Sequence, residues 1–176
     1  MGTTCGCGQH HDNHHHHEHH DHRNHEHHHG CGCAAQKPSF EGTISGLSGE
    51  EKEMLSLVYQ FGQLPVTRFV LKNSREDDII SIALSPVAIE ETDDSMQRVK
   101  ARGAVLTSLS DKGLIVLDYD TPLPGYDYDG YKNSELFAYF KQTVAQAQGQ
   151  SGFLFDTAGL EMGTMAVTEL GASLFA

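Results

Sequence analysis

All thirteen histidines and all four cysteines of this chain lie within its first 33 residues, and residues 34–176 contain neither type. The histidines stand between two Cys-Gly-Cys pairs, and the segment has almost no apolar side chains. A segment that has so little apolar surface to bury does not build a hydrophobic core. We therefore predict that residues 1–33 form a disordered tail and that the fold is built from the rest of the chain.

The side chains of this tail belong to one chemical class. Imidazole and thiolate groups bind borderline and soft divalent metals, so we expect zinc or nickel to bind, with cobalt and copper as further candidates. The expected ligands are all of its cysteines and histidines: Cys5, Cys7, His10, His11, His14, His15, His16, His17, His19, His20, His22, His25, His27, His28, His29, Cys31 and Cys33. In composition the tail is similar to the histidine-rich extensions of nickel and zinc chaperones and storage proteins.

A simpler interpretation of the tail is a cloned affinity tag. Such tags are usually uninterrupted histidine runs. Here the longest run is the four residues His14–His17, and acidic residues and asparagines interrupt the others. The Cys-Gly-Cys pairs also have no purpose in a tag. We therefore interpret the tail as a metal-binding segment.

Residues 34–46 are rich in small and turn-forming residues and are predicted to be a linker, which leaves one domain over residues 47–176. Four acidic residues and one arginine give residues 1–33 a net charge of −3, which leaves −9 of the total −12 for the remainder. A domain this acidic is not a general polyanion binder, and any contact with DNA requires a local basic patch.

The chain is expected to be cytoplasmic and to make no contact with a membrane. No apolar run approaches the roughly eighteen residues that span a bilayer, and the N-terminus lacks the hydrophobic stretch of a signal peptide. In the cytoplasm thiols stay reduced, which favours metal ligation over disulfides.

Three helices are predicted in the first half of the domain. Ser48 and Glu51 form a capping box that starts the first helix, and Gly62 ends it. Residues 76–84 fit a second helix, with acidic residues at its N-terminal end. The third is expected from Asp93 to about Lys112. Pro86 is expected to stop the second helix, and Gly113 the third. Residues 69–71 are apolar, but their pattern does not distinguish a helix from a strand.

The second half of the domain is predicted to alternate strands with one helix. Residues 114–119 read as a strand, 120–131 as a turn-rich acidic loop, and 134–148 as a fourth helix. Two further strand candidates are residues 153–155 and 162–168, which we expect to pair with each other or with strand 114–119.

Two segments carry a resemblance to the winged helix-turn-helix family. Residues 102–115 resemble a recognition helix and its exit into the first wing strand, and residues 163–171 resemble the returning wing strand and the turn after it. The resemblance implies an α+β, winged-helix-like domain with a three-helix core and a β-wing that contains a helical insertion. A fold resemblance of this kind does not establish function.

The resemblance also implies a site. The third helix would lie in the major groove, where its basic side chains would meet phosphates or base edges. The expected DNA-binding residues are Arg98, Lys100, Arg102 and Lys112. The alternative is a solvated helix face in a winged-helix domain that is used for protein contacts.

We do not expect the domain to be an enzyme. Without histidine and cysteine it lacks the commonest general base and the strongest protein nucleophile. It also contains neither a phosphate-binding P-loop nor a Gly-x-Gly-x-x-Gly turn.

Together these features predict a cytoplasmic, metal-linked winged-helix transcriptional regulator. The alternative is a cytoplasmic nickel or zinc storage or delivery protein whose folded domain docks a partner protein. Metal ions are the expected partners in both cases, with DNA, another protein or a second copy of the chain as further candidates.

Overall fold

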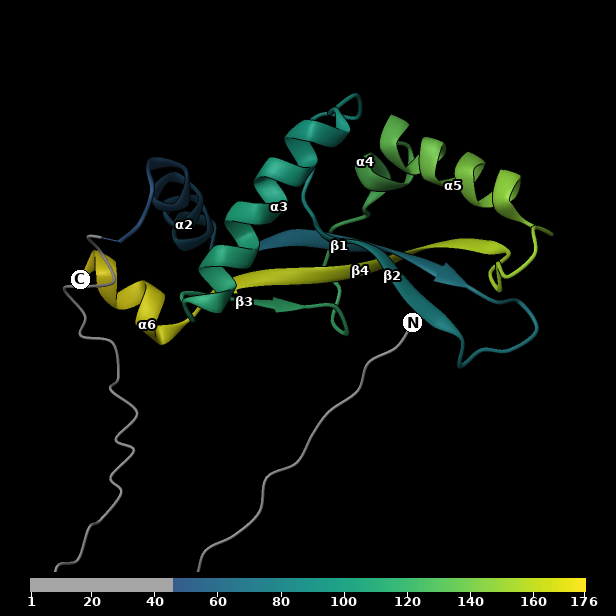
Figure 1. The fold of residues 1–176 in the computed structure, drawn as a ribbon. Helices are drawn as coiled ribbons and strands as arrows, with labels where there is room; N and C mark the ends of the chain where they lie inside the picture. Colours follow the sequence, from purple (N-terminus) through teal and green to yellow (C-terminus); the bar gives the residue numbers. More distant parts are fainter. Residues whose placement is uncertain (1–45) are drawn as a thin grey trace, which may run out of the picture. The chain divides into compact units, whose positions relative to one another are not determined.

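The computed structural model describes residues 46–176 (Figure 1), so the predicted metal tail and nearly all of the linker lie outside the described residues. The elements in chain order are α2 (Gly49–Phe61), β1 (Gln63–Lys72), β2 (Ile80–Val87), α3 (Met96–Asp111), β3 (Ile115–Asp118), α4 (Asp129–Lys132), α5 (Glu135–Ala147), β4 (Thr157–Val167), α6 (Glu169–Ala172) and a short 3₁₀ helix (Ser173–Phe175). The four strands form an antiparallel sheet in the order β2-β1-β4-β3. The α+β class is therefore confirmed.

Three of the four helices expected from local sequence are confirmed, as α2, α3 and α5. At α2 the Ser48 hydroxyl accepts a hydrogen bond from the Glu51 N–H at 3.1 Å, and the Glu51 carboxylate accepts one from the Ser48 N–H at 2.7 Å. Ser95 caps α3 and Ser134 caps α5 in the same way, each accepting a hydrogen bond from a backbone N–H three residues on. Such a cap satisfies a backbone donor that the helix cannot, and its signal lies within four residues of sequence.

The predicted second helix is wrong, because residues 80–87 are strand β2. Its isoleucines pair with β1 in an antiparallel hairpin, where Ile80 lies opposite Lys72 and Ile82 opposite Val70. The preceding acidic residues lie in the connection between the two strands. Pro86 is inside the strand, which an edge strand tolerates because its outer N–H groups need no partner.

Strand β4 (Thr157–Val167) begins before the strand predicted at residues 162–168. Residues 153–155 are not a strand, whereas residues 162–167 belong to β4, which pairs along β1 from Thr157 to Ala166. The expected pairing with the strand at 114–119 is confirmed by β3. Residues 69–71, which the sequence left undecided, lie in β1.

The core consists of two clusters on either side of a point midway along β1. In the first, Leu55 and Val58 of α2 pack with Leu106 and Leu109 of α3 around Val66. The second cluster gathers residues of the central strands, α3 and the segment from α4 to α5: Phe69, Val87, Val99, Tyr128, Tyr131, Leu136 and Phe137. In Figure 1, α2, α3 and α5 lie above the strands of the sheet. Burial of these apolar side chains is the main stabilising contribution to the fold.

Helix α3 packs unusually close to the end of β2. Gly103 lies on its buried face, and a Cβ atom at this position would come within 2.7 Å of the Pro86 carbonyl oxygen. Glycine therefore allows the helix to pack against the strand without displacing either.

The winged-helix arrangement is not confirmed. Its second helix is strand β2, so the segments expected to form a three-helix core instead form two helices and a hairpin. The two expected wing strands do pair as β3 and β4, with the predicted helix α5 between them in sequence. However, β4 also pairs with β1 over almost its full length, which makes it a central strand of a larger sheet. Within residues 46–176 no helix is long and apolar enough to span a bilayer.

Candidate functional site

The four basic residues predicted to bind DNA differ in exposure and in their ion pairs. Arg98 is 73% exposed and lies 3.8 Å from the Asp94 carboxylate, one helical turn away. Lys100 is also exposed, and within residues 46–176 no carboxylate lies within 4.0 Å of its ammonium group. These two side chains on the N-terminal half of α3 can contact an external partner.

Arg102 is committed to contacts within the protein. Its guanidinium Nη1 donates hydrogen bonds to the Ala88 carbonyl at 2.7 Å and to Asp94 at 3.0 Å, and Nη2 lies 3.0 Å from Glu90. The Arg102 side chain is 15% exposed and that of Asp94 only 2%. Arg102 therefore neutralises a buried carboxylate and ties α3 to the segment after β2.

Asp94 is stabilised in its charged form by this arrangement. Burial alone would raise the pKa of its carboxyl group, but hydrogen bonds from the Glu90 and Glu91 N–H groups and from Arg102 outweigh burial and lower that pKa below its usual range. Its charge is therefore retained at neutral pH.

Lys112 is likewise engaged inside the domain. Its ammonium group and the Ser108 hydroxyl both contact the Glu51 carboxylate, which ties the end of α3 to the start of α2. The hydrogen bond from Lys112, with that from Ser108, lowers the pKa of Glu51 from 4.5 to about 2. Two of the four expected DNA contacts thus serve the packing of α3.

Replacing Glu51 with glutamine should lower the free energy of unfolding at neutral pH by about 1–3 kcal/mol, because Lys112 and Ser108 lose a charged acceptor. Since folding lowers the pKa of Glu51, the stabilisation is complete above pH 4.5 and is lost as the pH falls toward about 2. Urea unfolding at a series of pH values measures both effects.

The matched control is Glu53→Gln, an exposed residue of the same helix, which should change stability by less than about 0.5 kcal/mol. A difference between the Glu51 variant and the wild type that stayed constant from neutral pH down to about pH 2 would contradict this assignment.

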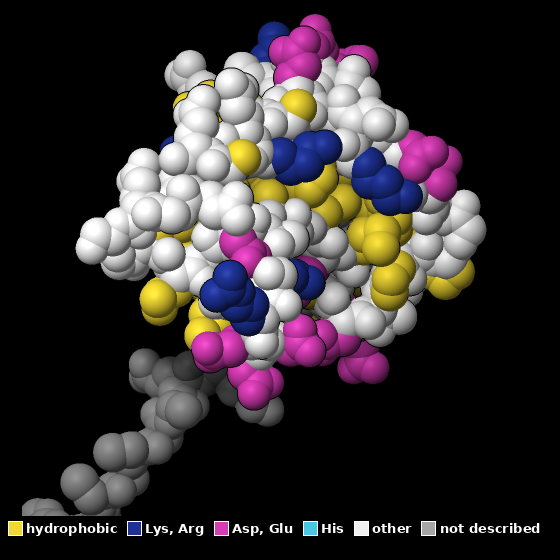
Figure 2. All heavy atoms as spheres, turned by 90° about the vertical axis from the view of Figure 1, so that its right-hand side faces the viewer, with side chains coloured by type: hydrophobic (Ala, Val, Ile, Leu, Met, Phe, Trp, Pro, Cys, Tyr) yellow, Lys and Arg dark blue, Asp and Glu magenta, His cyan; other side chains and the backbone are white. Residues whose placement is uncertain are grey.

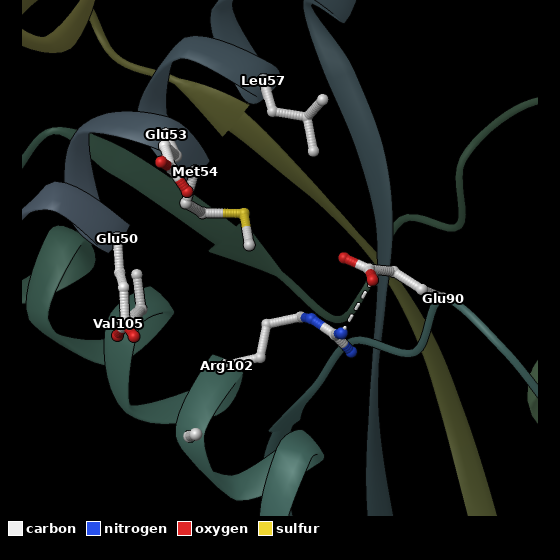
Figure 3. A pocket seen from close by; sticks show the side chains of 8 residues that line it. Glu50, Glu53, Met54, Leu57, Glu90, Arg102 and Val105 are labelled. Carbon is white, nitrogen blue, oxygen red and sulfur yellow. Dashed lines mark ion pairs between the residues drawn. The ribbon is translucent and has the colours of Figure 1, made fainter. Parts of the chain in front are cut away.

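A concave site lies between α2 and α3, and we call it the α2–α3 cleft (Figure 3). It has a volume of about 360 Å³ and is lined by Glu50, Glu53, Met54, Leu57, Glu90, Ala101, Arg102 and Val105. In Figure 3 the side chain of Arg102 extends from α3 toward Glu90, and Met54 and Leu57 extend from α2. A smaller cavity of about 170 Å³ adjoins it and reaches the buried Tyr131.

The charge of the α2–α3 cleft is negative. Three glutamates line it, and the charge of its one arginine is already paired with Asp94 and Glu90. An apolar wall with an acidic rim favours a group that combines an apolar body with a cationic end. The lining side chains of the cleft include neither an imidazole nor a thiol.

Sequence reasoning did not identify this cleft. Met54 lies half-buried at the cleft, and Leu57 is 40% exposed there. The spacing of Asp94 and Arg98 at i and i+4 is a local pattern that indicates an ion pair at the start of α3. The closer partner of Asp94, however, is Arg102, which lines the cleft. In the described part of the chain, residues 46–176, no group of three or more potential metal ligands is present.

No family model matches the chain, and no curated protein matches it. Among solved structures it is similar to an uncharacterized protein from the hydrocarbon-degrading marine bacterium Alcanivorax borkumensis, with 15% sequence identity and a TM-score of 0.47. The match covers 77% of this chain and 89% of that protein. A likeness at this level carries no argument about function.

Proposed function

We propose that this protein binds transition-metal ions through residues 1–33 and stores or delivers them while its folded domain docks a partner protein. The observation that carries the proposal is the complete separation of ligand types: every histidine and cysteine precedes Ala34. A segment with seventeen such side chains has a high density of zinc and nickel ligands. The core clusters of the domain need none of them.

The charges on α3 support docking of a protein over binding of DNA. Arg102 and Lys112 each neutralise a buried carboxylate, and turning either side chain toward a phosphate would remove the closest counter-charge of that carboxylate. The segment that leads into α3 adds Glu90, Glu91 and Asp93 to the same region. Phosphate contacts need an accumulation of positive charge, which this surface does not provide.

The α2–α3 cleft supports the choice of a protein partner. It presents an apolar wall of Met54, Leu57 and Val105 beside acidic side chains, so a partner segment with a lysine or arginine next to an apolar residue fits its chemistry. The residues that line this cleft are all different from the proposed metal ligands, which lie within residues 1–33.

A metal-linked transcriptional regulator is the second candidate function. Arg98 and Lys100 favour it, because both are exposed on the half of α3 that a recognition helix would present to DNA. The two functions differ in whether the domain selects a nucleotide sequence.

Selection from a random duplex DNA pool on the full-length protein, with and without zinc, tests the proposal. We expect no enriched sequence, because only two basic side chains of α3 are available. An enriched duplex whose retention is lost in an Arg98→Ala, Lys100→Ala double variant would overturn the docking function and establish the regulator. The matched control is Lys52→Ala, an exposed lysine on α2.

A further inference from the structure

Strand β2 is an edge strand with an unusual composition. Within residues 46–176 no strand pairs with its outer edge. From Ile79 to Ile89 the sequence contains no charged residue, although charged residues make up 20% of the chain. Ile80 and Ile82 are 48% and 56% exposed. Soluble proteins usually protect such an edge with charges, because its backbone groups can pair with another strand.

A groove adjoins this edge, and we call it the β2 groove. It lies between β2, the start of α3 and α5, has a volume of about 220 Å³, and is lined by Phe69, Ala83, Leu84, Met96, Lys100, Tyr139, Phe140 and Thr143. Figure 2, which views the right-hand side of Figure 1, shows hydrophobic side chains gathered in a hollow with basic side chains at its rim. Tyr139 is 62% exposed at this groove. The structure thus places an apolar groove beside an unpaired strand edge.

The charge of the β2 groove selects the occupant. Lys100 is its one charged lining residue, and no described carboxylate lies within 4.0 Å of that ammonium group. The α2–α3 cleft, in contrast, is lined by three glutamates. An occupant of the β2 groove therefore gains from a carboxylate, whereas a basic segment meets an unpaired positive charge.

We propose that β2 accepts an extended, acidic segment of a partner protein as an additional strand of the sheet. The main chain of the segment pairs with β2 between Ile80 and Leu84, and alternate side chains point to the side of the groove. A bulky apolar side chain fills the space beside Tyr139 and Phe140, and an Asp or Glu pairs with Lys100. This surface is separate from the α2–α3 cleft and does not depend on metal binding.

A phage-displayed library of random linear peptides, selected on the full-length protein in the presence of a chelator, provides the probe. We expect enriched peptides to contain Asp or Glu together with bulky apolar residues at alternate positions. With an enriched peptide bound, hydrogen exchange at the backbone amides of residues 80–84 should slow. Enrichment of basic peptides, or of no peptide, would overturn the proposal.

Matched variants separate the groove from general effects on the protein. Tyr139→Ala and Lys100→Glu should each weaken peptide binding by about tenfold, measured by fluorescence anisotropy. Phe61→Ala removes a ring that is also 62% exposed, and Lys52→Glu reverses the charge of another exposed helical lysine, so both should bind normally. Equal losses in all four variants would contradict the site. A dimer that dissociates on Ile82→Lys would show that a second copy of the chain occupies the edge instead.

Discussion

The full-length protein should bind about four zinc or nickel ions, because tetrahedral sites use about four ligands each and the tail supplies seventeen. The affinities should differ among sites, with those that recruit thiolates filling first with zinc. Binding should weaken as the pH falls through about 6.5, since protons compete for the imidazole nitrogens. Isothermal titration of the metal-free protein measures both the stoichiometry and its dependence on pH.

Two substituted full-length chains serve as controls. Replacing all thirteen histidines with glutamine and all four cysteines with serine should abolish this binding. Replacing only Cys5, Cys7, Cys31 and Cys33 with serine should remove the tightest zinc sites and leave nickel binding by imidazole. Equal stoichiometry in the wild type and the fully substituted chain would refute metal binding by residues 1–33. Thermal unfolding of both metal-free chains should match the wild type, since neither core cluster contains a histidine or cysteine.

Arg102→Ala should lower the free energy of unfolding by about 3–5 kcal/mol, the usual result of removing one partner of a buried ion pair. The Asp94 carboxylate, only 2% exposed, would lose its main counter-charge, and the Ala88 carbonyl would lose its donor. The matched control is Arg98→Ala, because Arg98 lies on the same helix and is also an ion-pair partner of Asp94. Arg98 is 73% exposed, so its loss should cost less than about 1 kcal/mol.

A second substitution tests the cause of the Arg102 effect. Adding Asp94→Asn to Arg102→Ala should recover part of the lost stability, because a neutral amide is less costly to bury without a counter-charge than a carboxylate. Chemical denaturation at neutral pH measures all of these variants. Equal and small losses for Arg98→Ala and Arg102→Ala would show that the charge of Asp94 does not depend on Arg102.

Local sequence was sufficient to predict the three long helices. Each begins at a serine that caps it, at positions 48, 95 and 134, and each buries apolar residues at helical spacing. Strand β3 was also predicted. These features depend on residues within a few positions of one another.

The features that were predicted wrongly or not at all depend on contacts between residues that are distant in the sequence. Residues 76–84 contain acids followed by apolar residues, which is compatible with either a helix or a turn and strand. Pairing with β1 decided for the strand, since β1 offers a ten-residue partner. The roles of Arg102 and Lys112 could not be predicted either, because Lys112 contacts Glu51 across 61 residues of sequence and Arg102 contacts the Ala88 carbonyl outside its own helix.

The sequence alone determined the separation of metal-ligand types from the folded domain, since composition needs no tertiary contact to be read. It also determined where α2, α3 and α5 begin, because a capping hydroxyl acts on a backbone N–H three residues away. Only the tertiary structure decided which cations of α3 remain exposed and which neutralise buried carboxylates. That choice depends on burial, which raises the cost of an unpaired charge, and burial exists only once the strands and helices have packed.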